Sequence, residues 1–160
     1  MDSVVARAMA KWPNVPAVYG WLSLDRRGNW RIRSTSATER FERIGNAALR
    51  EFIGRNYEAD SAGRWYFQNG PQRVYVTLAY TPLVVHHEGD ELIDHCGRPF
   101  AARIAYLDDE GSVLVAGERA IALLDDRDLV RYAESEALLQ RITRAEIPAR
   151  FGFVQEPKAA

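Results

Sequence analysis

The sequence is poor in cysteine and in long apolar runs. Its only cysteine is Cys96, so no disulfide can form within the chain. A secreted protein stabilised by disulfides is therefore disfavoured. No run of about 18 apolar residues occurs, which excludes a conventional transmembrane helix. The first residues carry charges at Asp2, Arg7 and Lys11 and do not form a signal peptide. We therefore expect a cytoplasmic protein with a reduced thiol and no membrane partner.

An excess of charge of either sign is also lacking. The 160 residues include 21 Lys and Arg against 22 Asp and Glu, a formal net charge of -1. Proteins dedicated to nucleic acids usually carry a basic excess that neutralises phosphates, so nucleic-acid binding is disfavoured. Hydrophobic residues at 47% and charged residues at 27% are typical of a globular protein, and the length suits one domain or two fused subdomains.

Strong enzyme signatures are absent. The sequence has no Gly-x-Ser-x-Gly elbow, phosphate loop, dinucleotide fingerprint or His-Glu-x-x-His motif. The cluster of metal-ligand residue types contains His86, His87, His95 and Cys96. Neighbouring residues of a strand point to opposite faces, so these side chains should diverge, and surface or interface histidines are the default interpretation. We predict no metal, no cofactor and no catalytic residue.

The acidic run from Asp125 to Asp128 has two interpretations. Paired carboxylates can perform acid-base chemistry, and a small hydrolase or isomerase that uses Asp126 and Asp128 with a histidine remains the enzymatic alternative. Helix starts favour the same residues, because their oxygens accept hydrogen bonds from free backbone amides and their charge suits the helix dipole. Helix capping is the preferred interpretation.

The clearest structural signal is a repeated turn pattern, Asp-x-x-Gly. Its first occurrence, Asp25 to Gly28, predicts a hairpin over residues 21–33. The register implied by that turn puts four apolar residues on one face of the sheet, namely Leu22, Leu24, Trp30 and Ile32. The pattern recurs at Asp60 to Gly63 and at Asp108 to Gly111, and the latter lies between two apolar strands.

Helices are expected at a few places between the hairpins. Asn46 can cap a helix with Leu49, Phe52 and Ile53 on one stripe. The remaining predicted elements are a helix capped by Ser3, one starting at Asp125 or Asp126, a helical stretch at 137–142 and a strand at 151–154. The predicted class is α+β: antiparallel hairpins packed with a few helices, as two fused subdomains, 1–82 and 83–160, with a repeated hairpin-plus-helix motif.

The hairpin over residues 65–80 offers the candidate binding surface. Trp65, Phe67, Val74 and Val76 should pack on the Asn46 helix, and the other face should present Tyr66, Arg73 and Tyr75. Aromatic and Arg side chains together are typical of binding hot spots. The candidate binding residues are Tyr66, Gln68, Asn69, Gln72, Arg73 and Tyr75. The structural alternative is a two-sided hairpin buried between the subdomains.

Four stretches also resemble a small family of uncharacterised proteobacterial proteins, a domain of unknown function: residues 24–30, 63–76, 123–129 and 147–154. More distantly, the layout is similar to another uncharacterised bacterial family, which has two α+β subdomains with repeated motifs and a suggested signalling role. The resemblance carries over no catalytic residue. Together with the hairpin surface it favours a non-catalytic regulatory module that binds a small molecule or a protein partner.

Overall fold

The computed structural model describes residues 1–34 and 40–160. The chain forms two compact units. Unit 1 comprises residues 1–25, 29–79 and 153–160, and unit 2 comprises residues 26–28 and 80–152. The predicted subdomain boundary between residues 82 and 83 stays a prediction. The chain passes from unit 1 to unit 2 between Ala79 and Tyr80, and it returns to unit 1 between Gly152 and Phe153. No helix in these described ranges is long and apolar enough to cross a bilayer.

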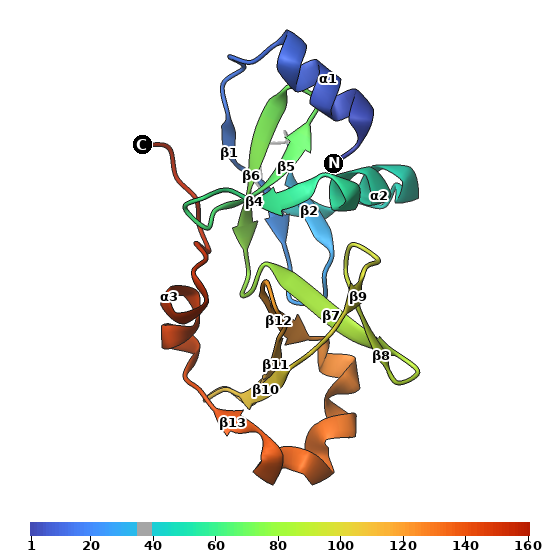
Figure 1. Cartoon of the computed structure of the whole chain (residues 1–160), viewed down its shortest axis with the longest axis vertical. Coiled ribbons are helices and arrows are strands. Elements are labelled where there is room, and N and C mark those ends of the chain that lie inside the picture. The colour runs from blue at the N-terminus through green and yellow to red at the C-terminus, as the bar shows by residue number, and fades with distance from the viewer. Residues whose placement is uncertain (35–39) are drawn as a thin grey trace. The chain divides into compact units, whose positions relative to one another are not determined.

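Unit 1 is built on a six-stranded sheet in the order β3-β2-β1-β6-β5-β4. Its strands are β1 (Val18–Leu24), β2 (Trp30–Arg33), β3 (Phe41–Arg43), β4 (Tyr57–Ala59), β5 (Trp65–Asn69) and β6 (Gln72–Leu78). Two three-stranded antiparallel meanders are joined at the centre, where β1 and β6 run parallel. Figure 1 shows these strands side by side.

The first hairpin has the predicted register, with Leu22 opposite Ile32 and Leu24 opposite Trp30. Leu22, Leu24 and Trp30 are buried, whereas Ile32 is exposed. The turn is held locally, because Asp25 accepts hydrogen bonds from the backbone and side-chain nitrogens of Asn29. The central parallel pairing then places Leu24 beside Leu78 in the core of unit 1.

Two helices belong to unit 1: α1 (Ser3–Lys11) and α2 (Ala47–Arg55). The Asn46 side chain accepts a hydrogen bond from the backbone of Leu49, as expected for the cap of α2. Helix α1 begins one residue after its cap, which is Asp2; the prediction that Ser3 caps it was wrong. The predicted packing of α2 on β5 is confirmed by the edge-on contact of Phe52 with Phe67, whose ring centroids are 5.6 Å apart.

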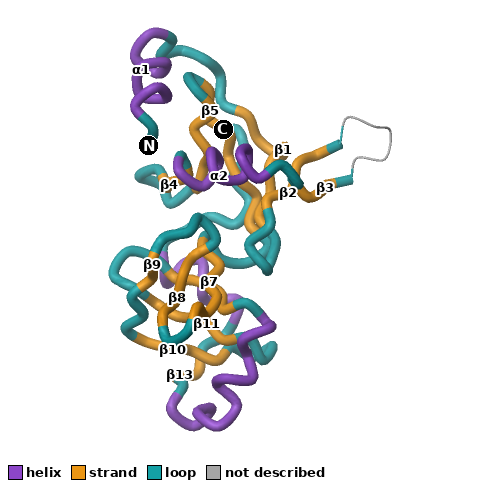
Figure 2. Tube along the Cα trace, turned by 90° about the vertical axis from the view of Figure 1, so that its right-hand side faces the viewer, coloured by secondary structure: helices purple, strands orange, loops and turns teal. Residues whose placement is uncertain are grey.

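Unit 2 has a seven-stranded sheet in the order β13-β10-β11-β12-β7-β8-β9. Its strands are β7 (Leu83–Glu88), β8 (Glu91–Asp94), β9 (Pro99–Phe100), β10 (Ile104–Leu107), β11 (Val113–Ala116), β12 (Ile121–Leu124) and β13 (Gln140–Arg141). In the hairpin around Asp108 to Gly111, every residue of β11 is buried, whereas β10 is buried only at Tyr106 and Leu107 and exposes Ile104. The tube in Figure 2 marks these strands in orange.

The two sheets repeat one topology. In unit 2 the meanders β7-β8-β9 and β10-β11-β12 are joined by parallel pairing of β7 with β12, just as β1 pairs with β6 in unit 1. Thus the first strand of each unit lies beside the last strand of its second meander. Helix α2 separates the two meanders of unit 1, whereas only residues 101–103 separate β9 from β10. The duplicated element is therefore the pair of meanders, and the expected repetition of a helix is not seen at that point.

The C-terminal part of unit 2 corrects two predictions. It contains two 3₁₀ helices, η1 (Asp126–Leu138) and η2 (Arg144–Glu146), and the α-helix α3 (Ile147–Phe151). The helical stretch expected at 137–142 is wrong, because Gln140 and Arg141 form β13 alongside β10. The strand expected at 151–154 is also wrong, since its start lies in α3 and only Val154 makes a single bridge, to Arg64 within unit 1. Both outcomes depend on partners that are distant in sequence.

Candidate binding cavity

The predicted binding residues lie on the hairpin of β5 and β6 in unit 1. Tyr66 pairs with Tyr75 and Gln68 pairs with Arg73, so these four side chains share one face of the sheet. The prediction that Tyr66, Arg73 and Tyr75 share a face is therefore confirmed. Helix α1 lies near the end of this hairpin in unit 1, as Figure 1 shows. The space between them holds the site.

A cavity of about 340 Å³ opens on this face. Helix α1 and the segment that follows it provide an apolar wall, and the polar groups come from the hairpin and from Tyr19 of β1. The wall consists of Met9, Trp12, Pro13, Val15 and Ala17. The other lining residues are Tyr19, Gln68, Pro71, Arg73 and Tyr75. This volume lies within the range of small-molecule sites, which are typically apolar with a few converging polar groups.

Gln68 is the most unusual group in the lining. Its side chain is 2% exposed, and its Nε2 donates a hydrogen bond of 3.0 Å to the carbonyl oxygen of Gly70. That contact fixes the orientation of the amide, because a reversed amide would place two oxygens against each other. The amide oxygen Oε1 is buried without any hydrogen-bond partner. A buried acceptor without a donor costs about 1–3 kcal/mol, which a ligand with a suitable donor would recover.

Arg73 is the only cation among the described residues that line the cavity. Its guanidinium lies 3.9 Å from the centre of the Tyr66 ring and donates a long hydrogen bond of 3.4 Å to the hydroxyl of Tyr75. Among residues 1–34 and 40–160 no carboxylate forms an ion pair with Arg73. The aromatic ring thus holds the guanidinium in place, and most of its donors remain available.

Tyr75 is fixed at the base of the site by a local network. Its ring stacks on Tyr19 with centroids 4.8 Å apart, and its hydroxyl donates a hydrogen bond of 2.9 Å to Asp60 Oδ2. Arg64 donates to the same carboxylate oxygen at 2.8 Å and lies 4.7 Å from the Tyr75 ring. The turn residue Asp60 therefore also anchors a side chain that lines the cavity.

The pKa values follow from these contacts. Burial works to raise the pKa of Asp60, but hydrogen bonds from Arg64 and Tyr75 outweigh it and hold that pKa below its usual value. Burial and the nearby Glu58 carboxylate raise the pKa of Tyr66 to about 12. Asp60 is therefore ionised and Tyr66 is neutral at neutral pH, so neither group is poised for proton transfer.

The six predicted residues take different positions around this cavity. Gln68, Arg73 and Tyr75 line it, and Tyr66 is buried beneath Arg73. Asn69 and Gln72 pair at the end of the hairpin and do not line the cavity. The expectation that Tyr66 and Tyr75 are presented at the surface was wrong, since they are only 5% and 3% exposed. Their burial is explained by stacking on neighbouring side chains of unit 1.

Sequence reasoning missed the contribution of the N-terminal region to the site. The apolar wall comes from α1 and the segment after it, where the sequence predicted only a helix capped by Ser3. A signal was present in the sequence, because Met9 and Trp12 lie three residues apart and share one side of a short helix. Trp12 is 51% exposed even in the folded unit, which suits a residue at the rim of a cavity.

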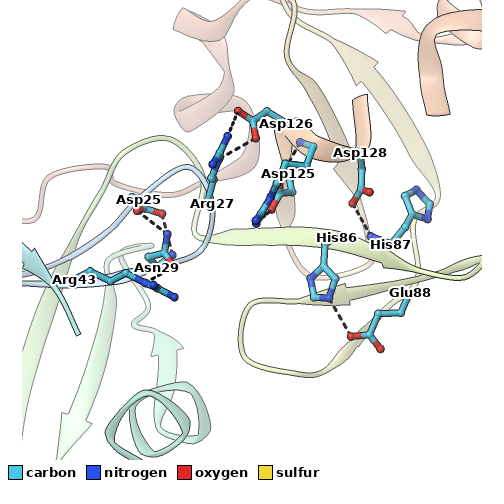
Figure 3. A network of polar contacts seen from close by, with 11 residues as sticks. Asp25, Arg27, Asn29, Arg43, His86, His87, Glu88, Asp125, Asp126 and Asp128 are labelled. Atoms are coloured by element: carbon cyan, nitrogen blue, oxygen red, sulfur yellow. Dashed lines mark hydrogen bonds and ion pairs between the residues drawn. The ribbon is translucent and has the colours of Figure 1, made fainter. Parts of the chain in front are cut away.

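The acidic residues of the enzymatic alternative have structural roles within unit 2 (Figure 3). Asp125 caps η1 and binds Arg127, as the capping interpretation predicts. Asp126 pairs with Arg27, and Asp128 accepts a hydrogen bond from the backbone of His87. In the described part of the chain no three or more His, Cys, Asp or Glu side chains lie together as a metal site would need.

Cys96 lies in a turn of unit 2 and is partly buried. Burial, assisted by the nearby Asp94 carboxylate, raises the pKa of its thiol to about 12. The thiolate is the reactive form of cysteine, so this side chain is a poor nucleophile at neutral pH. Its backbone amide donates a hydrogen bond to Asp94 Oδ1, which indicates a structural role in the turn.

Unit 2 contains two further hollows beside β10, of about 370 and 320 Å³. Both are lined by Leu107, Asp108, Asp109 and Arg141. Their charged groups are already engaged: Asp109 accepts a hydrogen bond from the backbone of Arg144, and Arg141 pairs with Glu136. The cavity of unit 1 differs from them because its lining combines a residue with a buried, unpartnered acceptor and a cation that forms no ion pair with any described residue.

Comparison with known proteins gives a family and a fold. Residues 1–138 match the model of a family described as "Protein of unknown function (DUF2946)". No curated protein matches the chain significantly. One similar solved structure is a DUF1285 family protein from Silicibacter pomeroyi DSS-3, with a TM-score of 0.52 and 16% identity, covering 84% of each chain. A second, from Shewanella baltica OS155, has a TM-score of 0.51 and 14% identity, covering 71% of this chain and 90% of the other.

Proposed function

The chain belongs to the family of proteins of unknown function whose model it matches over residues 1–138, and from that premise we propose that it is a non-catalytic, cytoplasmic ligand-binding module with regulatory function. The ligand is a small molecule that occupies the cavity between α1 and the β5-β6 hairpin. The observation that carries this proposal is Gln68, a residue of the cavity lining whose buried Oε1 has no hydrogen-bond partner.

Three features support binding over catalysis at this position. The described residues of the lining include no histidine, cysteine or carboxylate, so they offer no ordinary general base or activated nucleophile. The lining phenols are Tyr19 and Tyr75: the Tyr75 hydroxyl donates a hydrogen bond to Asp60, and the Tyr19 ring is stacked on that of Tyr75. Apolar walls with a few fixed polar groups bury and orient a ligand without changing it.

The test is a thermal-shift screen of the full chain against a panel of small metabolites. A ligand at 100 times its Kd adds about 2.7 kcal/mol to the free energy of unfolding. For a protein of this size that corresponds to a rise in Tm of roughly 5–10 °C. Arg73→Gln should abolish the shift for the same ligand, because it removes the cation of the cavity and keeps a polar side chain of similar length.

The matched control is Arg43→Gln, which alters an exposed arginine of β3 in the same unit that does not line the cavity. This variant should keep the ligand-induced shift. A panel in which no compound stabilises the protein, or a shift that survives in Arg73→Gln, would exclude the cavity as the functional site.

A further inference from the structure

The charges of the chain are divided unevenly between its two units. Unit 1 contains 11 Lys and Arg against 8 Asp and Glu, whereas unit 2 contains 10 against 14. The near-zero charge of the whole chain, which disfavours a nucleic-acid partner, therefore combines a basic unit with an acidic one. A partner that carries many negative charges would be attracted to unit 1.

Two arginines of unit 1 lie side by side on its sheet. Arg31 of β2 and Arg43 of β3 are directly opposite each other in the antiparallel register, so their side chains share one face. Like charges in this position repel each other and lower the stability of the sheet. Of the carboxylates in the described ranges, only Asp25 forms an ion pair with either arginine, with Arg31 at 3.0 Å. The pair therefore keeps an excess positive charge that an anionic partner would neutralise.

The turn between β1 and β2 holds both guanidinium groups in place. Asp25 Oδ2 accepts a hydrogen bond of 3.0 Å from Arg31 Nε, and Asn29 Oδ1 accepts one of 3.0 Å from Arg43 Nε. The Asn29 amide is itself oriented by its bond to Asp25 (Figure 3). The terminal nitrogens of both arginines form no hydrogen bond with residues 1–34 or 40–160. These N–H groups match the geometry of phosphate oxygens.

Exposed aromatic rings lie beside the arginine pair on the same face. Phe41 pairs with Arg33, two residues along the strands from the arginine pair, and is 37% exposed. Trp21 of β1 is 44% exposed. It precedes Leu22, which shares the opposite face with Ile32, so Trp21 lies on the face of Phe41. Nucleic-acid bases stack on rings exposed in this way.

We propose that this face of unit 1 binds single-stranded nucleic acid, with phosphates on Arg31 and Arg43 and bases stacked on Phe41 and Trp21. Phe41 and Arg43 are two residues apart in β3, which corresponds to about 6.6–6.8 Å. A nucleotide, in which a sugar separates the phosphate from the base, spans a similar distance. None of the four residues lines the cavity of unit 1, so this site is additional to the proposed function.

The exposed rings favour a single strand over other polyanions. The bases of a duplex are stacked inside it and cannot lie on the rings of a sheet face. An acidic peptide would satisfy the arginines and leave Phe41 and Trp21 without a planar partner. Proteins that bind single strands combine basic side chains along the backbone with aromatic side chains under the bases, and the face of β1, β2 and β3 offers both.

Fluorescence anisotropy of the full chain with a labelled oligouridine of about ten nucleotides tests the proposal. The affinity should fall about sevenfold to twentyfold between 50 and 200 mM salt, because two or three phosphate contacts each add about 0.7 to the slope of log affinity against log salt. An RNA duplex of the same length and an oligoglutamate peptide should each compete about tenfold or more weakly than the unlabelled oligouridine.

Two variants assign the two parts of the contact. Arg43→Gln removes a phosphate contact, so it should weaken binding about fivefold or more and reduce the salt slope by about 0.7. Phe41→Leu keeps an apolar side chain and removes the ring, so it should weaken binding about fivefold or more at an unchanged slope. The matched control is Arg7→Gln in α1, which removes an exposed arginine of the same unit and should change the affinity by less than about twofold, because salt screens charges away from the contact.

The proposal is overturned if the duplex or the peptide competes as well as the oligouridine, or if Arg7→Gln loses as much affinity as Arg43→Gln. Unchanged binding by Phe41→Leu also overturns it, as does displacement of the oligouridine by an equal concentration of uridine monophosphate. Melting curves establish that each variant is folded, and the wild-type competitions decide the matter for a variant that is not. The proposed function is tested separately, since Arg43→Gln should lose the oligouridine and keep the thermal shift of a cavity ligand.

Discussion

Gly28 provides a sharp test of the packing in unit 2. It has a φ of 81°, and a Cβ atom added there would lie 2.7 Å from the Cβ of His95 and 3.5 Å from that of Val84. The short distance is to a side-chain atom next to the backbone, which cannot rotate away. Gly111 occupies the same position of another Asp-x-x-Gly turn, with a φ of 83°, and an added Cβ meets nothing within 4 Å. The two glycines are therefore a matched pair.

The expected magnitudes follow from this difference. Alanine at either position adopts a left-handed backbone, at a cost of about 1–2 kcal/mol. Gly28→Ala must also displace His95, and overpacking of this kind costs a further 1–3 kcal/mol or so. We expect Gly111→Ala to lower the free energy of unfolding by about 1–2 kcal/mol and Gly28→Ala by about 2–5 kcal/mol.

Urea denaturation measures both values. The midpoint and the slope of the transition give the free energy of unfolding for each variant beside the wild-type protein. A double variant, Gly28→Ala with His95→Gly, removes the clashing Cβ and should recover part of the loss relative to the sum of its single variants. Equal destabilisation by the two alanine substitutions would refute the close approach of Gly28 to His95.

Two further predictions concern buried polar groups of unit 2. The Tyr80 hydroxyl donates a hydrogen bond of 2.7 Å to Asp108 Oδ2, and both residues are 2% exposed; Tyr80→Phe should therefore cost about 1.5–3 kcal/mol in urea denaturation. Tyr66→Phe is the control, since its partner Glu58 is exposed, and an equal loss in both variants would contradict the role of burial. Burial is the main cause that lowers the pKa of His87 from 6.5, so folding disfavours protonation of this ring. The stability that the neutral ring contributes is therefore complete above pH 6.5 and declines as the pH falls below it. His87→Gln should lose less stability than wild type between about pH 8 and about pH 5, and equal losses would argue against this assignment.

Local turn chemistry was the most predictable part of the fold. In the turns at Asp60 and Asp108, one carboxylate oxygen accepts backbone hydrogen bonds from residues two and four positions later. Glycine at the fourth position takes a positive φ that other residues adopt at a cost. A further turn of this kind, Asp94 to Gly97, has the same carboxylate contacts but was not predicted. His95 and Cys96 were weighed there as residues of a strand.

Elements that depend on distant partners were less predictable. Gln140 and Arg141 form a strand because β10 offers an open edge, and nothing in their own sequence indicates it. The parallel pairings of β1 with β6 and of β7 with β12 join residues roughly 40–55 positions apart, as the partners Leu24 and Leu78 illustrate. Hydrophobic alternation predicts which side of a strand is buried but does not identify its neighbour.

The candidate site was predictable only where it depends on alternation along a strand. Alternation along β5 and β6 correctly placed Tyr66, Arg73 and Tyr75 on one face. The cavity itself exists because α1 lies against that face, and the docking of a short helix on a sheet depends on tertiary contacts. The polar half of the site was thus visible in the sequence, whereas the apolar half needed the structure.

The route of the chain has a consequence for how the protein is made. The chain passes between the units four times, at residues 25 and 26, 28 and 29, 79 and 80, and 152 and 153. Leu78 donates its backbone hydrogen bond to Gln155, so unit 1 acquires this partner only after residue 155 has left the ribosome. Its folding during synthesis therefore finishes after unit 2 has been translated, and neither unit can be transferred to another protein as one uninterrupted gene segment.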